Sequence, residues 1–176
     1  MLKAAGEAGA RLVADLANVM IRNGDMPSDW EDSYIINIYK GKGDALVRGN
    51  YRGLKLLDHV MKEIERVIEQ IIRVRITIDD MQFGFMPGRG TTDAIFILRQ
   101  LQENHLAKNL KLYFAFVTLE KVFDCVPRKV IWWAMRKLGC EEWIVRFVQA
   151  TYTNTKSRVR VGDNYSDEFS VEVGVH

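Results

Sequence analysis

The sequence contains few of the residues that build disulfide frameworks or metal clusters. It has two cysteines, three histidines and three prolines among 176 residues. The two cysteines, Cys125 and Cys140, do not form a metal-ligand spacing, and a reduced intracellular protein, cytoplasmic or nuclear, is the simplest expectation. The histidines at 59, 105 and 176 have no Cys or Glu neighbour at ligand spacing, so we predict no metal site from them.

Long apolar runs are also missing. No segment approaches the roughly 20 apolar residues that span a bilayer, and the first residues lack the apolar stretch of a signal peptide. We therefore expect no membrane partner. The net charge of +2 is too small to establish a nucleic-acid partner by itself. Apolar residues make up 48% and charged residues 27%, which is enough to build the core of one globular domain or of a piece of a larger one.

Apolar periodicity predicts an α+β chain with several helices and a small sheet. Helical spacing appears around residues 12–20, 60–72, 92–106, 127–138 and 143–151, with Asp58 as an N-cap and with Gly24 and Gly139 as C-terminal stops. Strands are predicted at 33–40, 112–117, 158–161 and 169–173, with a turn at 162–164. The segment 112–117 has the composition of a buried strand and ends at Thr118, beside a cluster of acidic and aromatic residues.

Two loops carry basic residues that suit phosphate binding. Between residues 38 and 75 there are nine Lys or Arg and five Asp or Glu, a local excess of four positive charges. The loop 40–44 contains Lys40 and Lys42, and Arg52 follows closely. A second loop, 87–93, places Arg89 and backbone N–H groups at the start of a helix. From spacing alone, solvated surface loops and a simple helix-capping turn explain these residues better than a phosphate site.

The order of these segments resembles the reverse transcriptase of LINE-type (non-LTR) retrotransposons. Residues 38–44 and 50–57 (IYKGKGD and NYRGLKLL) look like the first fingers motif, and 82–95 (QFGFMPGRGTTDAI) looks like the second. Residues 114–128 look like palm motif A, and 169–176 look like the approach to motif B. The resemblance covers nearly the whole chain and keeps the family's order, which makes it far more specific than any single motif.

The resemblance implies a right-hand polymerase that copies an RNA template from a DNA primer with two Mg²⁺ ions. In the family, aspartates of motifs A and C hold these ions, because two divalent cations so close together need several carboxylates. By position, Lys40, Lys42 and Arg52 correspond to residues that hold the nucleotide triphosphate, and Arg89 lies in a loop near the template. Phe123 corresponds to the ring that excludes a ribose 2′-hydroxyl.

The departures from the family pattern concern the metal site. Thr118 occupies the position of the motif A aspartate, and a neutral hydroxyl replaces a carboxylate poorly as a Mg²⁺ ligand. The sequence stops before the remainder of motif B and before motif C. We therefore expect a fragment truncated before motifs B and C, with an N-terminal helical segment (1–30), a fingers-like region (31–111) and a partial palm (112–176).

The resulting expectation is a chain without polymerase activity of its own, with no metal or other cofactor and with weak residual binding to RNA or DNA. Whether it is an enzyme stays open in the sequence. Two alternatives remain: a non-enzymatic interaction module whose protein partner is unknown, and one piece of a polymerase that another chain completes.

Overall fold

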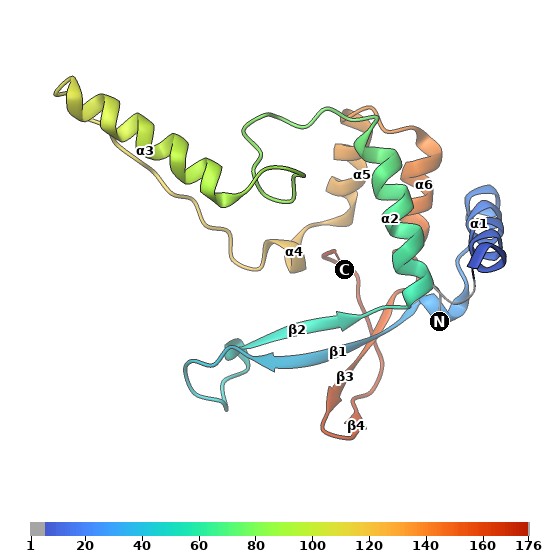
Figure 1. Ribbon diagram of the computed structural model, residues 1–176. Helices are drawn as coiled ribbons and strands as arrows, with labels where there is room; N and C mark the ends of the chain where they lie inside the picture. Colours follow the sequence, from blue (N-terminus) through green and yellow to red (C-terminus); the bar gives the residue numbers. More distant parts are fainter. Residues whose placement is uncertain (1–5, 176) are drawn as a thin grey trace. The chain divides into compact units, whose positions relative to one another are not determined.

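The computed structural model describes residues 6–175, and the chain forms two compact units within it (Figure 1). Unit 1 contains the described residues up to Ile76 and those from Lys121 onward, so its chain is discontinuous. Unit 2 contains Thr77–Glu120. The expected division into residues 1–30, 31–111 and 112–176 stays a prediction, and each unit is described by itself below.

Four long helices of unit 1 lie close to where apolar periodicity predicts them. They are α1 (Gly6–Asn23), α2 (His59–Arg73), α5 (Arg128–Lys137) and α6 (Glu142–Ala150). Helix α1 ends at Gly24, whose φ of +76° stops a helix. Asp58 caps α2, because its Oδ1 accepts hydrogen bonds from the backbone N–H groups of Val60 at 2.7 Å and Met61 at 3.2 Å.

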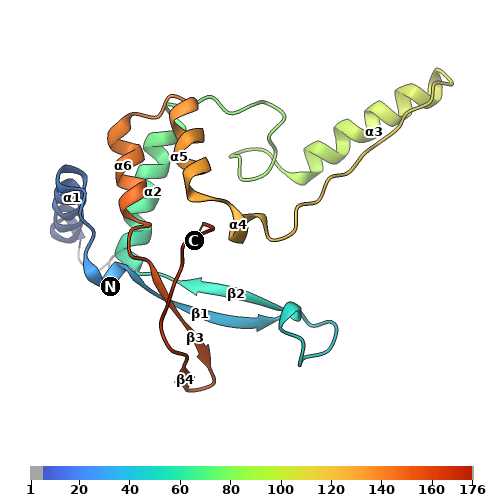
Figure 2. The same ribbon diagram turned by 180° about the vertical axis from the view of Figure 1, so that it is seen from behind.

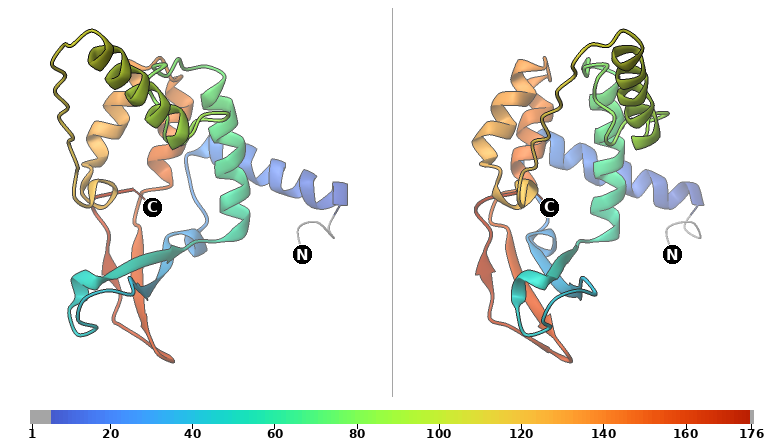
Figure 3. Two further views of the ribbon diagram at one scale, coloured as in Figure 1. Left: turned by 60° about the vertical axis from the view of Figure 1, so that its left-hand side comes forward. Right: turned by 90° about the vertical axis from the view of Figure 1, so that its left-hand side faces the viewer.

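The core of unit 1 lies where α1, α2 and α6 meet. Its buried members come from all three helices: Met20, Ile64, Ile68, Ile144 and Phe147. The three helices pack together through this cluster, and two further views show α2 beside α6 (Figure 3). The apolar stripe of α2, seen in the sequence at i, i+3 and i+4 spacing, supplies two of these side chains.

A small sheet forms the other part of unit 1. Its strands are β1 (Asp32–Tyr39), β2 (Tyr51–Leu56), β3 (Lys156–Val161), β4 (Asn164–Tyr165) and β5 (Phe169–Ser170). The order is β2-β1-β3-β4, and β5 also pairs with β3. Strands β1 and β3 run parallel, from Asp32 opposite Lys156 to Ile36 opposite Arg160, and all other pairs are antiparallel. Figure 2 shows β1 and β2 side by side with β3 beneath them.

Three details of the sheet differ from the sequence prediction. Residues 51–56 form β2, a strand that the sequence did not predict, because their glycine, lysine and arginine residues are not typical of strands. The turn 162–164 leads into β4, because Arg160 pairs with Tyr165 before the chain reaches β5. The predicted strand 169–173 is only two residues long. A buried hydroxyl pair, Ser33 Oγ to Ser157 Oγ at 2.7 Å, fixes the parallel β1–β3 register.

Unit 2 contains helix α3 (Thr91–Ala107), as predicted, followed by an extended segment. The buried strand expected at Leu112–Val117 is wrong. Within residues 6–175, the segment 112–117 has no strand partner, and the side chains of Tyr113, Phe116 and Val117 are 83%, 80% and 86% exposed. A strand exists only through hydrogen bonds to a neighbouring strand, and α3 satisfies its own backbone groups internally.

No helix within the described residues is both long and apolar enough to cross a membrane.

Candidate nucleic-acid interface

The loop between β1 and β2 presents the basic residues of the first predicted motif. The chain reverses through Gly41 and Gly43, with φ of +72° and +80°. The Tyr39 hydroxyl donates to the Gly43 carbonyl, and the Asn50 side-chain amide donates to the Asp44 carbonyl at 2.8 Å. A Cβ on Gly43 would lie 2.5 Å from Asn50 Nδ2, so the loop closes tightly here. These bonds give an exposed loop a defined conformation.

The structure distinguishes the two lysines of this loop, which the sequence leaves equivalent. Lys40 Nζ donates to the Gly49 carbonyl at 2.8 Å, and its backbone N–H donates to Asn50 at 2.8 Å. Its ammonium therefore braces the loop. Lys42 is exposed at the loop tip, and within residues 6–175 its ammonium has no hydrogen bond or ion pair. Of the two, Lys42 is the cation that remains available to an external phosphate.

Arg52 lies in β2 opposite Ile38, which places both residues on one face of the sheet. It is exposed, as are its face neighbours Ile38 and Leu54, which are 49% and 48% exposed. This face of β1 and β2 therefore combines a guanidinium with open apolar surface. Such a combination suits a ligand that has both phosphate and ring atoms.

Lys55 of β2 has a strongly lowered pKa and was not singled out in the sequence. It lies opposite Ile35, one residue after the exposed Leu54, so it points to the other face. Burial, and then the positive charges of Arg128 and Lys62, lower its pKa from 10.5 to about 8. No sequence signal marks Lys55, because the burial and the charges of α2 and α5 that lower its pKa arise only in the folded chain.

Arg128 is a second residue that sequence reasoning missed. Its guanidinium donates to the Tyr152 carbonyl at 2.9 Å, to Thr155 Oγ1 at 3.1 Å and to the Val171 carbonyl at 2.5 Å. It also lies 4.9 Å from the centre of the Tyr152 ring, within cation–π range. Arg128 thereby ties the start of α5 to the segments around β3 and β5.

Arg89 of the second predicted motif lies in unit 2 and is held by its own loop. Its Nη2 is 2.6 Å from Asp80 Oδ1, and its Nη1 donates to the Asp80 carbonyl. The following Gly90 N–H donates to Asp93 Oδ2 at 2.7 Å, which caps α3. The capping turn considered in the sequence is therefore present, although Gly90 and not a threonine is the N-cap. A turn begins at Asp79, whose carbonyl accepts the Gln82 N–H at 3.0 Å.

The motif A residues divide between the two units. Thr118 is exposed in the extended segment of unit 2. Phe123 lies in the short helix α4 (Val122–Cys125) of unit 1 and is 58% exposed. Helix α4 follows Lys121, whose φ of +47° places it in the left-handed region. Thr118 and Phe123 therefore belong to different units.

The segment predicted as motif A and the segment predicted as the approach to motif B meet inside unit 1. The Gly174 N–H donates to the Val126 carbonyl at 3.0 Å, and the Val175 N–H donates to the Phe123 carbonyl at 2.8 Å. Gly174 is buried with φ of +84°, and a Cβ there would lie 2.7 Å from the Asp124 carbonyl oxygen. The two motifs, about 50 residues apart in the sequence, are therefore joined through backbone contacts.

The described residues do not supply the ligand set for two Mg²⁺ ions. Among them, no three His, Cys, Asp or Glu side chains converge at metal-binding distance. The resemblance assigns Thr118 to the motif A metal position, and Thr118 offers only a neutral hydroxyl there. Hard divalent cations require several anionic oxygens, so these residues do not fit the metal pair.

Comparison with known proteins agrees with the resemblance found in the motifs. The family described as "Reverse transcriptase (RNA-dependent DNA polymerase)" matches residues 38–172. The chain is also 23% identical over 149 residues to the "Retrovirus-related Pol polyprotein from type-1 retrotransposable element R2" of Nasonia vitripennis, which covers 85% of this chain and 14% of that protein.

A second relative is the "Transposon TX1 uncharacterized 149 kDa protein" of Xenopus laevis. It is 23% identical over 146 residues, which covers 80% of this chain and 11% of that protein. The chain thus spans well under a fifth of the length of either relative. The fingers-type motifs, the mixed α/β fold of a right-hand polymerase and the family match lead to one conclusion. The chain belongs to the reverse transcriptase (RNA-dependent DNA polymerase) family, as a domain of the non-LTR retrotransposon type.

Proposed function

We propose that these 176 residues are the fingers and first part of the palm, and that they bind RNA or DNA without polymerising nucleotides. The observation that carries the absence of polymerisation is Thr118. A threonine hydroxyl holds no negative charge at neutral pH, whereas a two-metal site needs carboxylates that offset the charge of the ions. The binding itself is supported by the loop between β1 and β2.

Lys42 and Arg52 are the residues that we propose for contact with phosphates. Both are exposed, and they lie on or beside a loop whose backbone is fixed by hydrogen bonds from Tyr39, Lys40 and Asn50. A pre-formed loop loses little conformational entropy when it binds. Lys40 supports this loop, and Arg89 supports its own loop in unit 2 through Asp80. Phe123 is proposed to line the nucleotide side of the motif A turn.

Primer extension tests the absence of polymerisation. The purified chain is incubated with an RNA template, a labelled DNA primer, deoxynucleotides and Mg²⁺ or Mn²⁺. We expect no extension of the primer. Clear incorporation of nucleotides would refute this half of the proposal, whatever the result of the binding measurement.

Fluorescence anisotropy with labelled single-stranded RNA tests the binding. We expect micromolar or weaker binding that falls steeply with salt, because phosphate contacts release condensed counterions. The variant Lys42→Gln should weaken binding about three- to fivefold and reduce the salt slope by about one. Lys137→Gln, at the exposed end of α5, is the matched control and should leave both unchanged. Equal behaviour of the two variants would refute the part assigned to Lys42.

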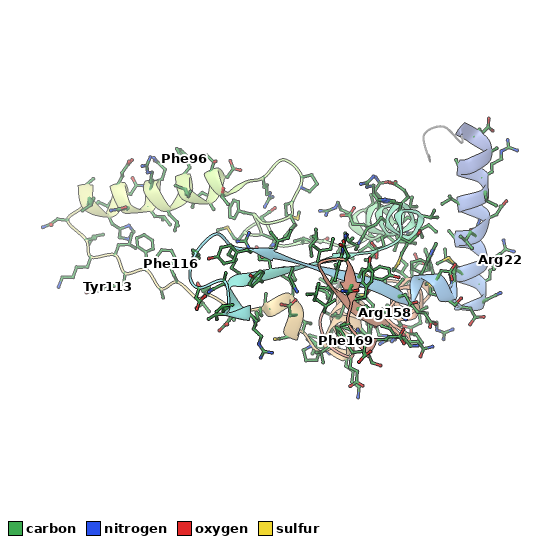
Figure 4. All side chains as sticks on the ribbon, turned by 90° about the horizontal axis from the view of Figure 1, so that it is seen from below. Arg22, Phe96, Tyr113, Phe116, Arg158 and Phe169 are labelled. Carbon is green, nitrogen blue, oxygen red and sulfur yellow. The ribbon has the colours of Figure 1, made fainter. Side chains whose placement is uncertain are left out.

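A second candidate function is a non-enzymatic interaction module, and the open apolar surface of unit 2 favours it. Phe96 of α3 and Tyr113 and Phe116 of the extended segment are 62%, 83% and 80% exposed (Figure 4). Large exposed apolar side chains mark a protein interaction site where they form one contiguous patch. Sedimentation velocity decides between the candidates. A concentration-dependent assembly that Tyr113→Ser and Phe116→Ser abolish would favour the module, and a stable monomer would count against it.

A third possibility is that another chain completes the polymerase. Mixing this chain with a separately produced palm segment that holds the motif C carboxylates tests it. Because Thr118 still occupies the motif A position, we expect no nucleotide addition in the mixture.

A further inference from the structure

Lys55 carries a charge for which the fold supplies no counter-ion. It lies on β2 and points to the face of the sheet opposite to that of Leu54, where it is half-buried. Within residues 6–175 its ammonium group makes no hydrogen bond or ion pair. A half-buried ammonium group without a partner is unusual, because burying a charge is costly unless hydrogen bonds or an opposite charge offset the loss of water.

Other lysines of unit 1 have the partner that Lys55 lacks. Lys62 Nζ is 2.9 Å from Glu65 Oε2, and Lys156 Nζ is 2.8 Å from Glu168 Oε1. The hydrogen bond to Glu168, and then the charge of that carboxylate, raises the pKa of Lys156. The pKa of Lys55 moves in the opposite direction, to about 8.

Two further cations act on Lys55 from neighbouring elements. Arg128 begins α5, and its guanidinium is held by three hydrogen bonds, while its buried Nε has no partner among the described residues. Lys62 lies in α2, the helix that follows β2 along the chain (Figure 1). After burial, the charges of Arg128 and then of Lys62 are the causes that lower the pKa of Lys55. Glu172 offsets part of the Arg128 charge. We call Lys55, Lys62 and Arg128 the cationic cluster.

The cationic cluster gives Lys55 the character of a nucleophile. A lysine attacks carbonyl groups only as the neutral amine, and desolvation beside other cations favours that form. At pH 7.5 roughly a quarter of an amine with a pKa of about 8 is neutral, compared with about 0.1% of an ordinary lysine. Lower basicity makes each neutral amine roughly ten- to twentyfold less reactive, at a Brønsted slope of about 0.4–0.5. The two effects together leave a gain of about tenfold.

The position of Lys55 leaves room for a small reactant. Among the described residues β2 pairs only with β1, so it is an edge strand, and the β1 residue opposite Lys55 is the uncharged Ile35. The positive charges of Arg128 and Lys62 attract an anion toward the amine. A small acyl phosphate suits this site, because it combines an anionic group with a reactive carbonyl carbon.

We propose that Lys55 is a covalent modification site that takes an acyl group from a small acyl phosphate, which the charges of Arg128 and Lys62 attract. The neutral Nζ attacks the carbonyl carbon, and a C–N bond forms. The bond from that carbon to the phosphate oxygen breaks, inorganic phosphate leaves with the electron pair, and the amine proton passes to water. The product is an uncharged amide, so acylation removes the unpaired cation from the cationic cluster.

The test treats the full chain with limiting acetyl phosphate at pH 7.5. The remaining amines are then labelled with heavy acetic anhydride in urea, and peptide mass spectrometry gives the light fraction at each lysine. We expect Lys55 to react about tenfold faster than Lys137 at the exposed end of α5. Lys156, which is paired with Glu168, should react more slowly than Lys137.

Two results of this experiment would overturn the proposal. One is an equal rate at Lys55 and Lys137. The other is a preference for Lys55 that persists when acetyl phosphate is added to the chain in urea, because the cause would then be local sequence and not the fold. The reaction contains no nucleic acid, so its outcome is independent of the RNA or DNA binding proposed above.

A pair of variants on α2 tests the cationic cluster. Lys62→Gln removes one cation, which should raise the pKa of Lys55 and slow its acylation about two- to fourfold. Arg66→Gln is the matched control, because Arg66 lies on the same helix in a similar ion pair, 3.2 Å from Glu63, and is not among the charges that act on Lys55. Equal slowing in the two variants would overturn the part assigned to the cluster.

A neutral donor separates the reactivity of the amine from the attraction of the phosphate. An uncharged acetyl thioester of a small thiol acylates amines without offering an anion to the cluster. We expect the preference for Lys55 over Lys137 to be about two- to threefold larger with acetyl phosphate, and this excess should disappear in Lys62→Gln and at high salt. An equal preference with both donors would overturn the assignment to acyl phosphates.

Discussion

Replacing Gly174 with alanine tests the contact between the motif A and motif B segments. Two separate costs are expected. The first is conformational, because φ at Gly174 is +84° and an L-residue there costs about 1–2 kcal/mol. The second is steric, because the new Cβ would lie 2.7 Å from the Asp124 carbonyl oxygen and 2.9 Å from the Phe123 carbonyl oxygen. Both atoms belong to backbone, which cannot swing aside as a flexible side chain does.

Overpacking of this kind costs about 1–3 kcal/mol, so Gly174→Ala should destabilise unit 1 by about 2–5 kcal/mol in total. Gly139 provides a matched control. Its φ is also +84°, but a Cβ there meets no atom within 4 Å. Gly139→Ala therefore carries the conformational cost without the steric one, and the difference between the two variants isolates the contact between the motifs.

Urea denaturation followed by tryptophan fluorescence and circular dichroism measures the two free energies of unfolding. Trp132 and Trp143 lie in α5 and α6, so the fluorescence reports on unit 1. We expect Gly174→Ala to lose about 1–3 kcal/mol more than Gly139→Ala. Equal losses in the two variants would show that the segments are not in contact in solution, and the geometric account of this junction would be refuted.

Three further predictions follow from other residues. Arg128→Lys keeps the positive charge but loses the planar guanidinium that donates to Tyr152, Thr155 and Val171. The free energy of unfolding, measured by urea titration, should therefore fall by about 2–3 kcal/mol. An unchanged midpoint would refute the structural role assigned to Arg128. The pKa of Lys55 is about 8 in the folded chain and 10.5 in the unfolded chain. Between these two pH values the unfolded chain binds more protons than the folded chain, so the free energy of unfolding rises with pH. Because Lys55 is half-exposed, this rise is about 1 kcal/mol. It should vanish in Lys55→Met when the free energies of unfolding at pH 7.5 and pH 10 are compared. Burial raises the pKa of the Cys140 thiol, which makes the free energy of unfolding fall with pH, but this effect is the same in both proteins. Thr118→Asp alone should not produce primer extension, because one carboxylate does not hold two Mg²⁺ ions, and activity in that variant would contradict the metal argument.

The helices were predictable because each carries its own signal. Asp58 caps α2 and Gly24 ends α1 through bonds and dihedrals that involve only adjacent residues. The sheet was less predictable, since β2 contains Gly53 and two cations, and its place depends on β1. The prediction of a strand at 112–117 was wrong, because a strand also depends on a partner that the sequence does not identify. Its composition suits a strand, but no described neighbour pairs with it.

The candidate site shows the same limit. The sequence alone singles out Lys42 and Arg52 as candidates, because basic residues in or beside a glycine-containing loop are visible in it. Neither the perturbed pKa of Lys55 nor the bracing by Arg128 has a local signature, as both arise from residues on several elements.

The parallel pairing of β1 with β3 also sets the order in which the molecule can form. Asp32 and Lys156 are partners across 124 positions of sequence, and the intervening chain includes all of unit 2. Such a connection is entropically costly to close and belongs to the slow class of folding events. During synthesis, β1 and β2 leave the ribosome before β3. The edge of β1 that later pairs with β3 therefore stays open until residue 160 has been made. For that interval the edge of β1 is a place where a nascent chain can pair with another copy, and a chaperone that covers it should raise the yield of folded protein.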